Sequence, residues 1–264
     1  MSRAKSLWFR SAGVLLFLFL IGNVASMAWR WGRPYLLGDP LAGFPRVFLW
    51  AWERPENLEY LDPRMAGVAV LAKTLTLEDS RVTARPRMQP IRLPAGICAI
   101  AVIRIETRSA ILDDGIRREA IRHILDSART TGAAGIQIDF DAVASERAFY
   151  RNLLAELRPQ LPSGMKLSIT ALASWCMYDD WISGLPVDEA VPMLFRLGVE
   201  DAGARGFLRS GKDFRAARSR FSMGISTDEP PPRSPGNRRI YVFNPKPWTR
   251  ESANDALRYV RELR

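Results

Sequence analysis

The sequence predicts an α/β protein, a TIM-like (β/α)8 barrel that is somewhat irregular after its second strand and is preceded by an N-terminal hydrophobic helix. Three observations support this fold class. Eight short apolar runs recur along the chain, amphipathic helical patterns separate several of them, and the chain that follows the N-terminal segment has the length of one barrel domain. With 264 residues, of which 47% are hydrophobic, the protein can bury one large core.

The N-terminal segment is apolar over residues 12–29 (AGVLLFLFLIGNVASMAW). As a helix it would extend about 27 Å at about 1.5 Å per residue, which is marginally enough to cross a bilayer. The same segment fits a cleaved signal peptide, because the small residues Ser26 and Ala28 stand three and one positions before a possible cut. We therefore expect residues 1–32 to be either a signal peptide or a membrane anchor.

Basic residues flank this apolar segment unevenly. Arg3, Lys5 and Arg10 precede it, whereas Arg30 and Arg33 follow it. The positive-inside rule then exports the rest of the chain, so we expect either an inner-membrane protein that faces the periplasm of a bacterial envelope or a protein secreted to the periplasm. These five residues carry half of the formal net charge of +10, and beyond them basic and acidic residues are interspersed. This pattern argues against a nucleic-acid partner.

A linker is expected between the N-terminal segment and the barrel. Residues 33–45 (RPYLLGDPLAGFP) contain three prolines and two glycines, a composition typical of linkers. Residues 46–264 are then expected to form a single barrel domain.

The predicted strands alternate with helical segments over most of this domain. The candidate strands are residues 47–52, 67–75, 98–107, 134–141, 166–175, 190–197, 220–226 and 239–243. Helical spacing of apolar residues is found over 115–128, 145–157 and 249–264. Residues 81–93 (RVTARPRMQPIRL) alternate in an extended manner and contain two prolines, so we expect a helix to be missing after the second strand.

The fourth predicted strand carries a row of polar side chains. In the string GIQIDFD, which begins at Gly135, the residues Gln137, Asp139 and Asp141 alternate with apolar ones and therefore share one face. Burying such a row costs several kcal/mol unless the groups are hydrogen-bonded or paired. Active sites of barrels lie at the carboxyl ends of the strands, so the sequence predicts a site where this strand ends.

Other predicted strand ends are also rich in charged, amide and aromatic side chains. Carboxylates among tryptophans suit a sugar site, where one acid protonates a glycosidic oxygen and aromatic faces stack on the ring. We predict Asp141, Asp139 and Glu106 as catalytic residues. The predicted substrate-binding residues are Gln137, Arg104, Glu53, Trp52, Trp175, Trp248 and Asn244.

Structural alternatives exist for these residues. Asp139 and Asp141 can instead form a polar layer with Arg104, and Glu106 can be the ion-pair partner of the same arginine. Glu53 can order a loop, and the tryptophans can be ordinary core residues.

No metal or other cofactor is expected. The chain contains one histidine, His123, which is placed on an outer helix and is a poor candidate for a zinc ligand. The two cysteines, Cys98 and Cys176, are predicted to lie near opposite ends of the barrel, too far apart for a disulfide.

Three long strings resemble a bacterial domain-of-unknown-function family, number 3142, which carries no assigned activity. The strings are residues 48–62 (FLWAWERPENLEYLD), 135–150 and 167–195. More distantly, residues 135–141 are similar to the fourth-strand signature of the chitinase-type glycoside hydrolases. That resemblance implies a barrel with a substrate-assisted mechanism. It places Asp141 at the position of the acid and Asp139 at that of the carboxylate that orients an acetamido group.

The chain also departs from the chitinase-type pattern. Gln137 stands where that family has a further aspartate, and Asp141 stands where it has a glutamate, one methylene longer. Near the sixth strand, Phe195 lacks the tyrosine hydroxyl and Arg196 replaces an aspartate. Trp248 resembles the tryptophan that floors the sugar subsite.

These observations together predict an exported barrel that hydrolyses or binds an envelope or extracellular glycan. The alternative is a catalytically silent glycan-binding or envelope-assembly protein on the same barrel. A third possibility is a membrane-surface protein that holds acidic lipids through its basic flank.

Overall fold

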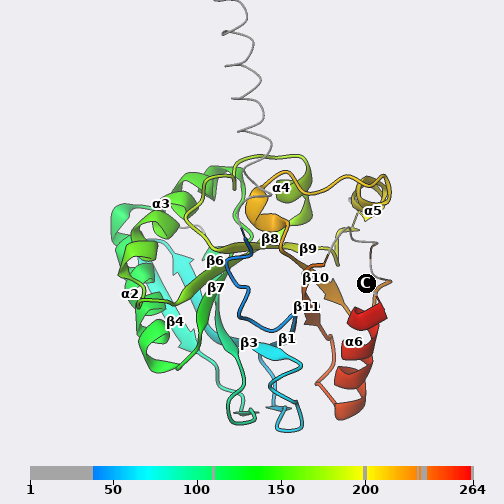
Figure 1. Ribbon diagram of the computed structural model, residues 1–264. Coiled ribbons are helices and arrows are strands. Elements are labelled where there is room, and N and C mark those ends of the chain that lie inside the picture. Colours follow the sequence, from blue (N-terminus) through cyan, green and yellow to red (C-terminus); the bar gives the residue numbers. More distant parts are fainter. Residues whose placement is uncertain (1–37, 109–110, 199–200, 231, 233–236, 263–264) are drawn as a thin grey trace, which may run out of the picture. The chain divides into compact units, whose positions relative to one another are not determined.

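The computed structural model describes residues 38–108, 111–198, 201–230, 232 and 237–262 (Figure 1). The predicted leader, residues 1–32, and residues 33–37 of the predicted linker lie outside this range. Within the described residues, no helix combines the length and the apolar character that crossing a membrane would require. The chain divides into two units, residues 1–42 and 43–264, and the second unit contains the sheet and the helices described below.

Eight parallel strands form a closed barrel, which confirms the predicted fold. Their order is β1-β11-β10-β9-β8-β7-β6-β3, and the pairing of β1 with β3 closes the ring. The strands are β1 (Val47–Ala51), β3 (Gly67–Glu78), β6 (Ala99–Arg108), β7 (Gly135–Asp139), β8 (Lys166–Leu172), β9 (Glu189–Met193), β10 (Ser222–Ser226) and β11 (Arg239–Phe243). Each lies within or overlaps one of the eight predicted runs.

Helices follow most of the strands. They are α2 (Asp114–Thr130), α3 (Arg147–Leu157), α4 (Ala173–Met177), α5 (Asp201–Arg209) and α6 (Arg250–Glu262), together with 3-10 turns at Ala144–Glu146, Arg158–Gln160 and Ala217–Ser219. Helix α2 begins where Asp113 accepts a hydrogen bond from the backbone N–H of Ile116, a standard N-cap. Helix α3 ends at Leu157, two residues before Pro159.

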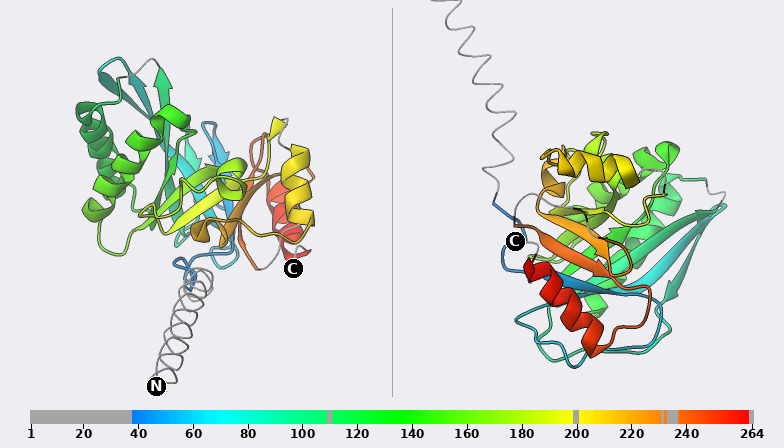
Figure 2. Two further views of the ribbon diagram at one scale, coloured as in Figure 1. Left: turned by 90° about the horizontal axis from the view of Figure 1, so that it is seen from above. Right: turned by 90° about the vertical axis from the view of Figure 1, so that its right-hand side faces the viewer.

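The unit after β3 is irregular, as predicted, because a strand replaces the helix there. Strand β4 (Arg81–Pro86) turns back and pairs antiparallel with β3, and a short parallel pair, β2 (Glu56–Asn57) with β5 (Ile91–Arg92), lies nearby in the chain. As a result β3 has 12 residues and β6 has 10, whereas the other barrel strands have 5 to 7. We call residues 74–86 and 104–108 the wing; Figure 2 shows these strands extending past the rest of the barrel.

The barrel has an inner and an outer apolar layer. The inner layer fills the space enclosed by the strands and consists of Phe48, Trp50, Ala69, Leu71, Ile100, Val102, Val191 and Tyr241. The outer layer lies between the strands and the helices and includes Ile136, Ile138 and Phe140. The alternation in the fourth-strand string therefore directs its apolar residues outward and its polar residues toward the barrel axis.

Candidate functional site

A polar network crosses the barrel interior below its mouth, which is the end of the barrel where the carboxyl ends of the strands lie. Trp50 donates a hydrogen bond from Nε1 to Oε1 of Gln137 at 2.8 Å, and Nε2 of Gln137 donates to Oγ of Ser168 at 3.1 Å. Gln137 is fully buried, with 0% of its surface exposed. Both ends of its amide are bonded to the protein, so the geometry assigns Gln137 a structural contact rather than the predicted ligand contact. Gln137 instead holds Trp50 in place.

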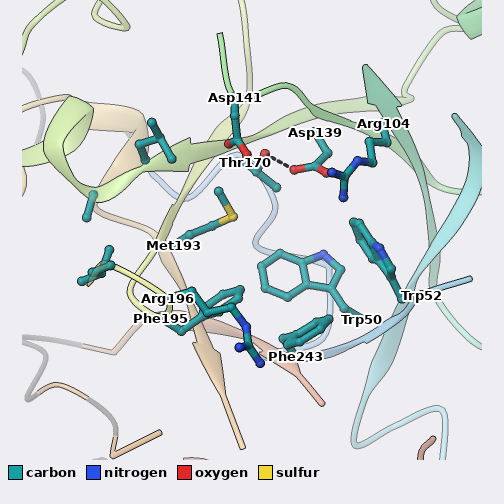
Figure 3. Close-up of a pocket in the computed structure, with 13 residues that line it drawn as sticks. Trp50, Trp52, Arg104, Asp139, Asp141, Thr170, Met193, Phe195, Arg196 and Phe243 are labelled. Carbon is teal, nitrogen blue, oxygen red and sulfur yellow. Dashed lines mark hydrogen bonds between the residues drawn. The ribbon is translucent and has the colours of Figure 1, made fainter. Parts of the chain in front are cut away.

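A cavity of about 470 Å³ opens at the carboxyl ends of the strands (Figure 3). This volume lies within the range of small-molecule sites. Its lining comprises Trp50, Trp52, Arg104, Asp139, Asp141, Thr170, Leu172, Ala173, Met193, Phe195, Arg196, Leu197 and Phe243. The predicted residues Asp139, Asp141, Arg104 and Trp52 thus meet around one hollow.

Two aspartates stand on one side of this cavity. Asp139 is the last residue of β7 and is half-buried, whereas Asp141 lies two residues farther along and is exposed. Oγ1 of Thr170, on the neighbouring strand β8, donates a hydrogen bond to Oδ1 of Asp139 at 2.8 Å. Figure 3 shows both carboxyl groups close to Thr170 at the edge of the hollow.

The surroundings of both aspartates favour the protonated form. Burial raises the pKa of Asp139 from 3.8 to about 6, and the negative charges of Asp141 and Glu106 act in the same direction. The Thr170 hydrogen bond and the charge of Arg104 oppose this rise. Burial also raises the pKa of Asp141, again against the influence of Arg104. A carboxyl group with a pKa of about 6 can gain or lose a proton near neutral pH, as an acid–base catalyst must.

Aromatic rings form the opposite side of the cavity. Phe195 and Phe243 are stacked with ring centroids 5.5 Å apart, and Trp52 meets Phe243 edge-on at 6.4 Å. Trp50 lies across the barrel because residue 224 is glycine: a Cβ at Gly224 would be 2.8 Å from the indole ring. Such flat apolar surfaces suit the faces of sugar rings.

Arg104 borders the cavity from β6. Its Nε lies 2.8 Å from Oε1 of Glu106, and its guanidinium carbon is 5.9 Å from the centroid of the Trp52 ring. Glu106 therefore lies beside the cavity rather than in its lining, and its nearest ion-pair partner is Arg104. This is the structural pairing that the sequence left open for Glu106.

Arg196 borders the cavity from the segment after β9. Its guanidinium lies over the ring of Phe243 at 5.7 Å, and Nη2 is 3.1 Å from a carboxylate oxygen of Asp228. Its φ is +54°, a left-handed conformation that is costly for a residue with a side chain. The backbone N–H of Arg196 donates to the carboxylate of Glu229 at 3.0 Å, which helps to hold this conformation.

Trp175 and Glu53, both predicted to bind substrate, lie away from the cavity. Strand β8 ends at Leu172, so Trp175 falls on helix α4, where it is 3% exposed and packs edge-on against Trp181. Glu53 accepts hydrogen bonds from the backbone N–H groups of residues 88 and 89, and thereby orders the loop after β4.

Trp248 and Asn244, also predicted to bind substrate, do not line the cavity either. Trp248 is 4% exposed, and its Nε1 donates to the backbone oxygen of Trp50 at 2.9 Å, so it braces β1. Asn244 directly follows β11 and is 6% exposed, and its Oδ1 accepts a hydrogen bond from Oγ1 of Thr227. The predicted tryptophan floor is provided by Trp50 instead.

Nine of the lining residues were not among the predicted site residues, and four of those nine are Trp50, Thr170, Met193 and Phe243. Each occupies an inward position of its strand, near the carboxyl end. Applying the period of two to every strand, as was done for the fourth, would have identified them. In the described part of the chain, no group of three or more histidine, cysteine, aspartate or glutamate residues is placed to hold a metal ion, and both cysteines are free.

Comparison with known proteins gave three results. A family model described as a domain of unknown function (DUF3142) matches residues 95–195, which confirms the family resemblance over the segment that carries both aspartates. A search among curated proteins gave no significant match. Among solved structures, the chain is similar to the spore cortex-lytic enzyme SleL of Bacillus cereus, with 19% identity and a TM-score of 0.47. That similarity covers 69% of this chain and 51% of the enzyme, so the match spans about half the length of that enzyme.

Proposed function

We propose that this barrel binds a glycan in the cavity at its mouth and hydrolyses a glycosidic bond there. One observation carries the proposal: two carboxyl groups with raised pKa values face a cavity whose other side is aromatic. Perturbed carboxyl groups in a cleft are typical of acid–base catalysis, and aromatic surfaces are typical of sugar binding. The similarity of residues 135–141 to the chitinase-type signature supports the same assignment.

The two aspartates have different roles in this proposal. Asp141 is the more exposed of the two and donates its proton to the glycosidic oxygen as the bond from that oxygen to the sugar carbon breaks. Asp139 lies deeper and takes up a proton near pH 6, so the two neighbouring carboxyl groups can share one proton. When that proton is on Asp141, the ionised Asp139, which Thr170 stabilises, balances the positive charge that develops on the sugar ring. A water molecule then adds to that carbon, and the proton it releases returns to Asp141.

Glycan binding without turnover is the second candidate. The observation that favours it is the stacking of Phe195 on Phe243, with an interplanar angle of 5°, which makes this side of the cavity apolar and aromatic. The chitinase-type pattern has a tyrosine hydroxyl at the position of Phe195 and a carboxylate at that of Arg196. Their replacement fits a protein that kept the sugar surface and lost the chemistry.

A glycan screen with matched variants distinguishes the two functions. Wild type, Asp141→Asn and Asp139→Asn are compared for binding and for release of reducing ends from cell-wall and extracellular polysaccharides. Asp255→Asn, an exposed position on α6, controls for the same chemical change elsewhere. We expect Asp141→Asn to lower turnover by about 10²- to 10⁴-fold and the control to retain it. Turnover unchanged in Asp141→Asn would exclude the proposed acid; binding without turnover in wild type would establish the second candidate.

We further propose that the glycan belongs to the bacterial envelope or its surroundings. The support is the basic-flanked apolar segment at residues 12–29. Cell fractionation of the full chain tests this location. Recovery with the membranes or the periplasm is expected, and recovery only in the cytosol would contradict it.

A further inference from the structure

A second hollow adjoins the cavity along the wing. It has a volume of about 300 Å³ and is lined by residues 104–108 of β6 and residues 139–141 at the end of β7. Arg104, Asp139 and Asp141 line both hollows. The two aspartates therefore lie between two spaces rather than at the end of one. We call the second space the wing groove.

The wing groove exists because β6 is longer than β7. The last residue pair between these strands is Arg104 with Asp139, yet β6 continues to Arg108, which adds about 13 Å at about 3.3 Å per residue. Over this stretch β6 pairs with β3 up to Glu78, and its other edge borders the groove. The extra length follows from the strand that replaced the expected helix after β3.

The two hollows differ in chemistry. The cavity has aromatic walls, whereas the wing groove presents Arg104, Glu106 and Arg108 at alternate positions, which place them on one face of β6. Oε1 of Glu106 lies 2.8 Å from Nε of Arg104, and Oε2 lies 3.9 Å from Nη2 of Arg108. All three side chains are partly exposed, at 40%, 33% and 65%. A row of charged donors and acceptors of this kind can bond the hydroxyl groups of a sugar.

The two walls of the groove are fixed to each other. Oγ1 of Thr107, in the wing, donates a hydrogen bond to Oε1 of Glu146, and Oε2 of Glu146 accepts from the backbone N–H of Val143. These contacts join the outer part of β6 to the segment that follows Asp141. The groove is thus preorganised beside the two aspartates, which lowers the entropic cost of binding.

We propose that the wing groove is a second subsite, which holds sugar units of a linear glycan whose neighbouring units lie in the aromatic cavity. The aspartates would then face an internal position of the chain rather than a terminal sugar. This inference rests on the proposed function, since it assigns the substrate class of the same site.

Chain-length dependence of binding tests the inference. The probes are cello-oligosaccharides and chito-oligosaccharides, the latter both N-acetylated and de-N-acetylated, from disaccharide to hexasaccharide. Affinity for the full-length protein is measured by titration calorimetry. For the series that binds, we expect the hexasaccharide to bind at least about tenfold more tightly than the disaccharide, because only the longer chain reaches the charged row.

A pair of matched variants locates the gain in affinity. Arg108→Gln removes a groove arginine, and Arg118→Gln makes the same change at an exposed position of α2. We expect the ratio of hexasaccharide to disaccharide affinity to fall severalfold in Arg108→Gln and to remain at the wild-type value in Arg118→Gln. Circular dichroism verifies that both variants are folded.

Two results would count against the inference, and they differ in what else they exclude. Equal affinity for short and long chains, or an undiminished ratio in Arg108→Gln, would overturn the wing subsite while glycan binding in the cavity stands. Failure of every glycan, in this series and in the polysaccharide screen, to bind wild type would exclude the proposed function and the wing subsite together.

Discussion

Glu189 and Asp139 are both acids inside the barrel, but the protein compensates their charges differently. Glu189 is fully buried at the start of β9, with 0% of its surface exposed. Its carboxylate lies 2.8 Å from Nη1 of Arg239 and accepts hydrogen bonds from the hydroxyl groups of Tyr241 and Ser168, at 2.7 and 3.0 Å. A buried charge of this kind is tolerated because a guanidinium and two hydroxyls replace the water it has lost.

Asp139 lies at the opposite ends of the strands and has weaker compensation. It accepts a hydrogen bond from Thr170, but burial raises its pKa, and the charge of a second acid beside it, Asp141, acts in the same direction. The base of the barrel is thus built for stability, whereas at the mouth the negative charge of Asp139 is only partly compensated. Incomplete compensation beside a cavity is what a proton-transfer site requires.

The largest expected change in stability is at the base of the barrel, where the amino ends of the strands lie. Arg239→Met removes the guanidinium and leaves Glu189 buried without its counter-ion, so we expect a loss of about 3–5 kcal/mol in the free energy of unfolding. Urea denaturation followed by circular dichroism measures this loss. In the double variant Glu189→Gln with Arg239→Met, the neutral amide keeps its hydroxyl partners, and part of the loss should be recovered. A single variant within about 1 kcal/mol of wild type would show that the base does not depend on this pair.

At the mouth, removing a charge is expected to raise the free energy of unfolding rather than to lower it. The pKa of Asp139 is raised from 3.8 to about 6, so the folded protein binds this proton more tightly than the unfolded chain does. The stabilisation from this group is complete below about pH 4 and is lost as the pH rises through about 6. The raised pKa corresponds to at most about 3 kcal/mol, and to about 1–2 kcal/mol after solvent screening.

Asp139→Asn should therefore be more stable than wild type at pH 7, by about 1–2 kcal/mol, and the difference should shrink toward pH 4. Denaturation curves at a series of pH values provide the test. A variant that is less stable than wild type at pH 7 would indicate that the ionised carboxylate is well compensated after all.

A smaller effect is expected from removing the hydroxyl group of Thr170, which donates a hydrogen bond to Asp139. Thr170→Val keeps the shape of the side chain and removes the hydrogen bond that favours the ionised form. We expect the pKa of Asp139 to rise by about one further unit. If the protein hydrolyses a glycan and needs Asp139 ionised, the acidic limb of its pH profile should move in the same direction. An unmoved acidic limb in a variant with demonstrated turnover would separate Asp139 from the chemistry.

Much of this site could be predicted from local patterns in the sequence. The alternation in the fourth-strand string fixes which way Asp139 faces, and the closed barrel then places it at the mouth. The extended, proline-containing segment at residues 81–93 likewise indicates that a helix is missing after β3. These inferences succeed because each depends only on neighbours along the chain.

The residues that could not be placed depend on contacts between distant segments. Trp248 follows a strand end but folds back to bond the backbone of Trp50, and Trp175 is carried outward because α4 begins at Ala173. The pairing of Glu106 with Arg104 was open for a different reason: the two residues share one face of β6, and either could have turned into the cavity. The length difference between β6 and β7, which forms the wing groove, requires the register of both strands.

An NMR titration of the side-chain carboxyl carbon of Asp139 in the wild-type protein measures directly how far the charge at the mouth is compensated. Assignment follows from the signal that disappears in Asp139→Asn. We expect a midpoint near pH 6. A midpoint near the ordinary aspartate value of about 4 would show that the charge at the mouth is fully compensated, and would remove the basis for a proton-transfer site there.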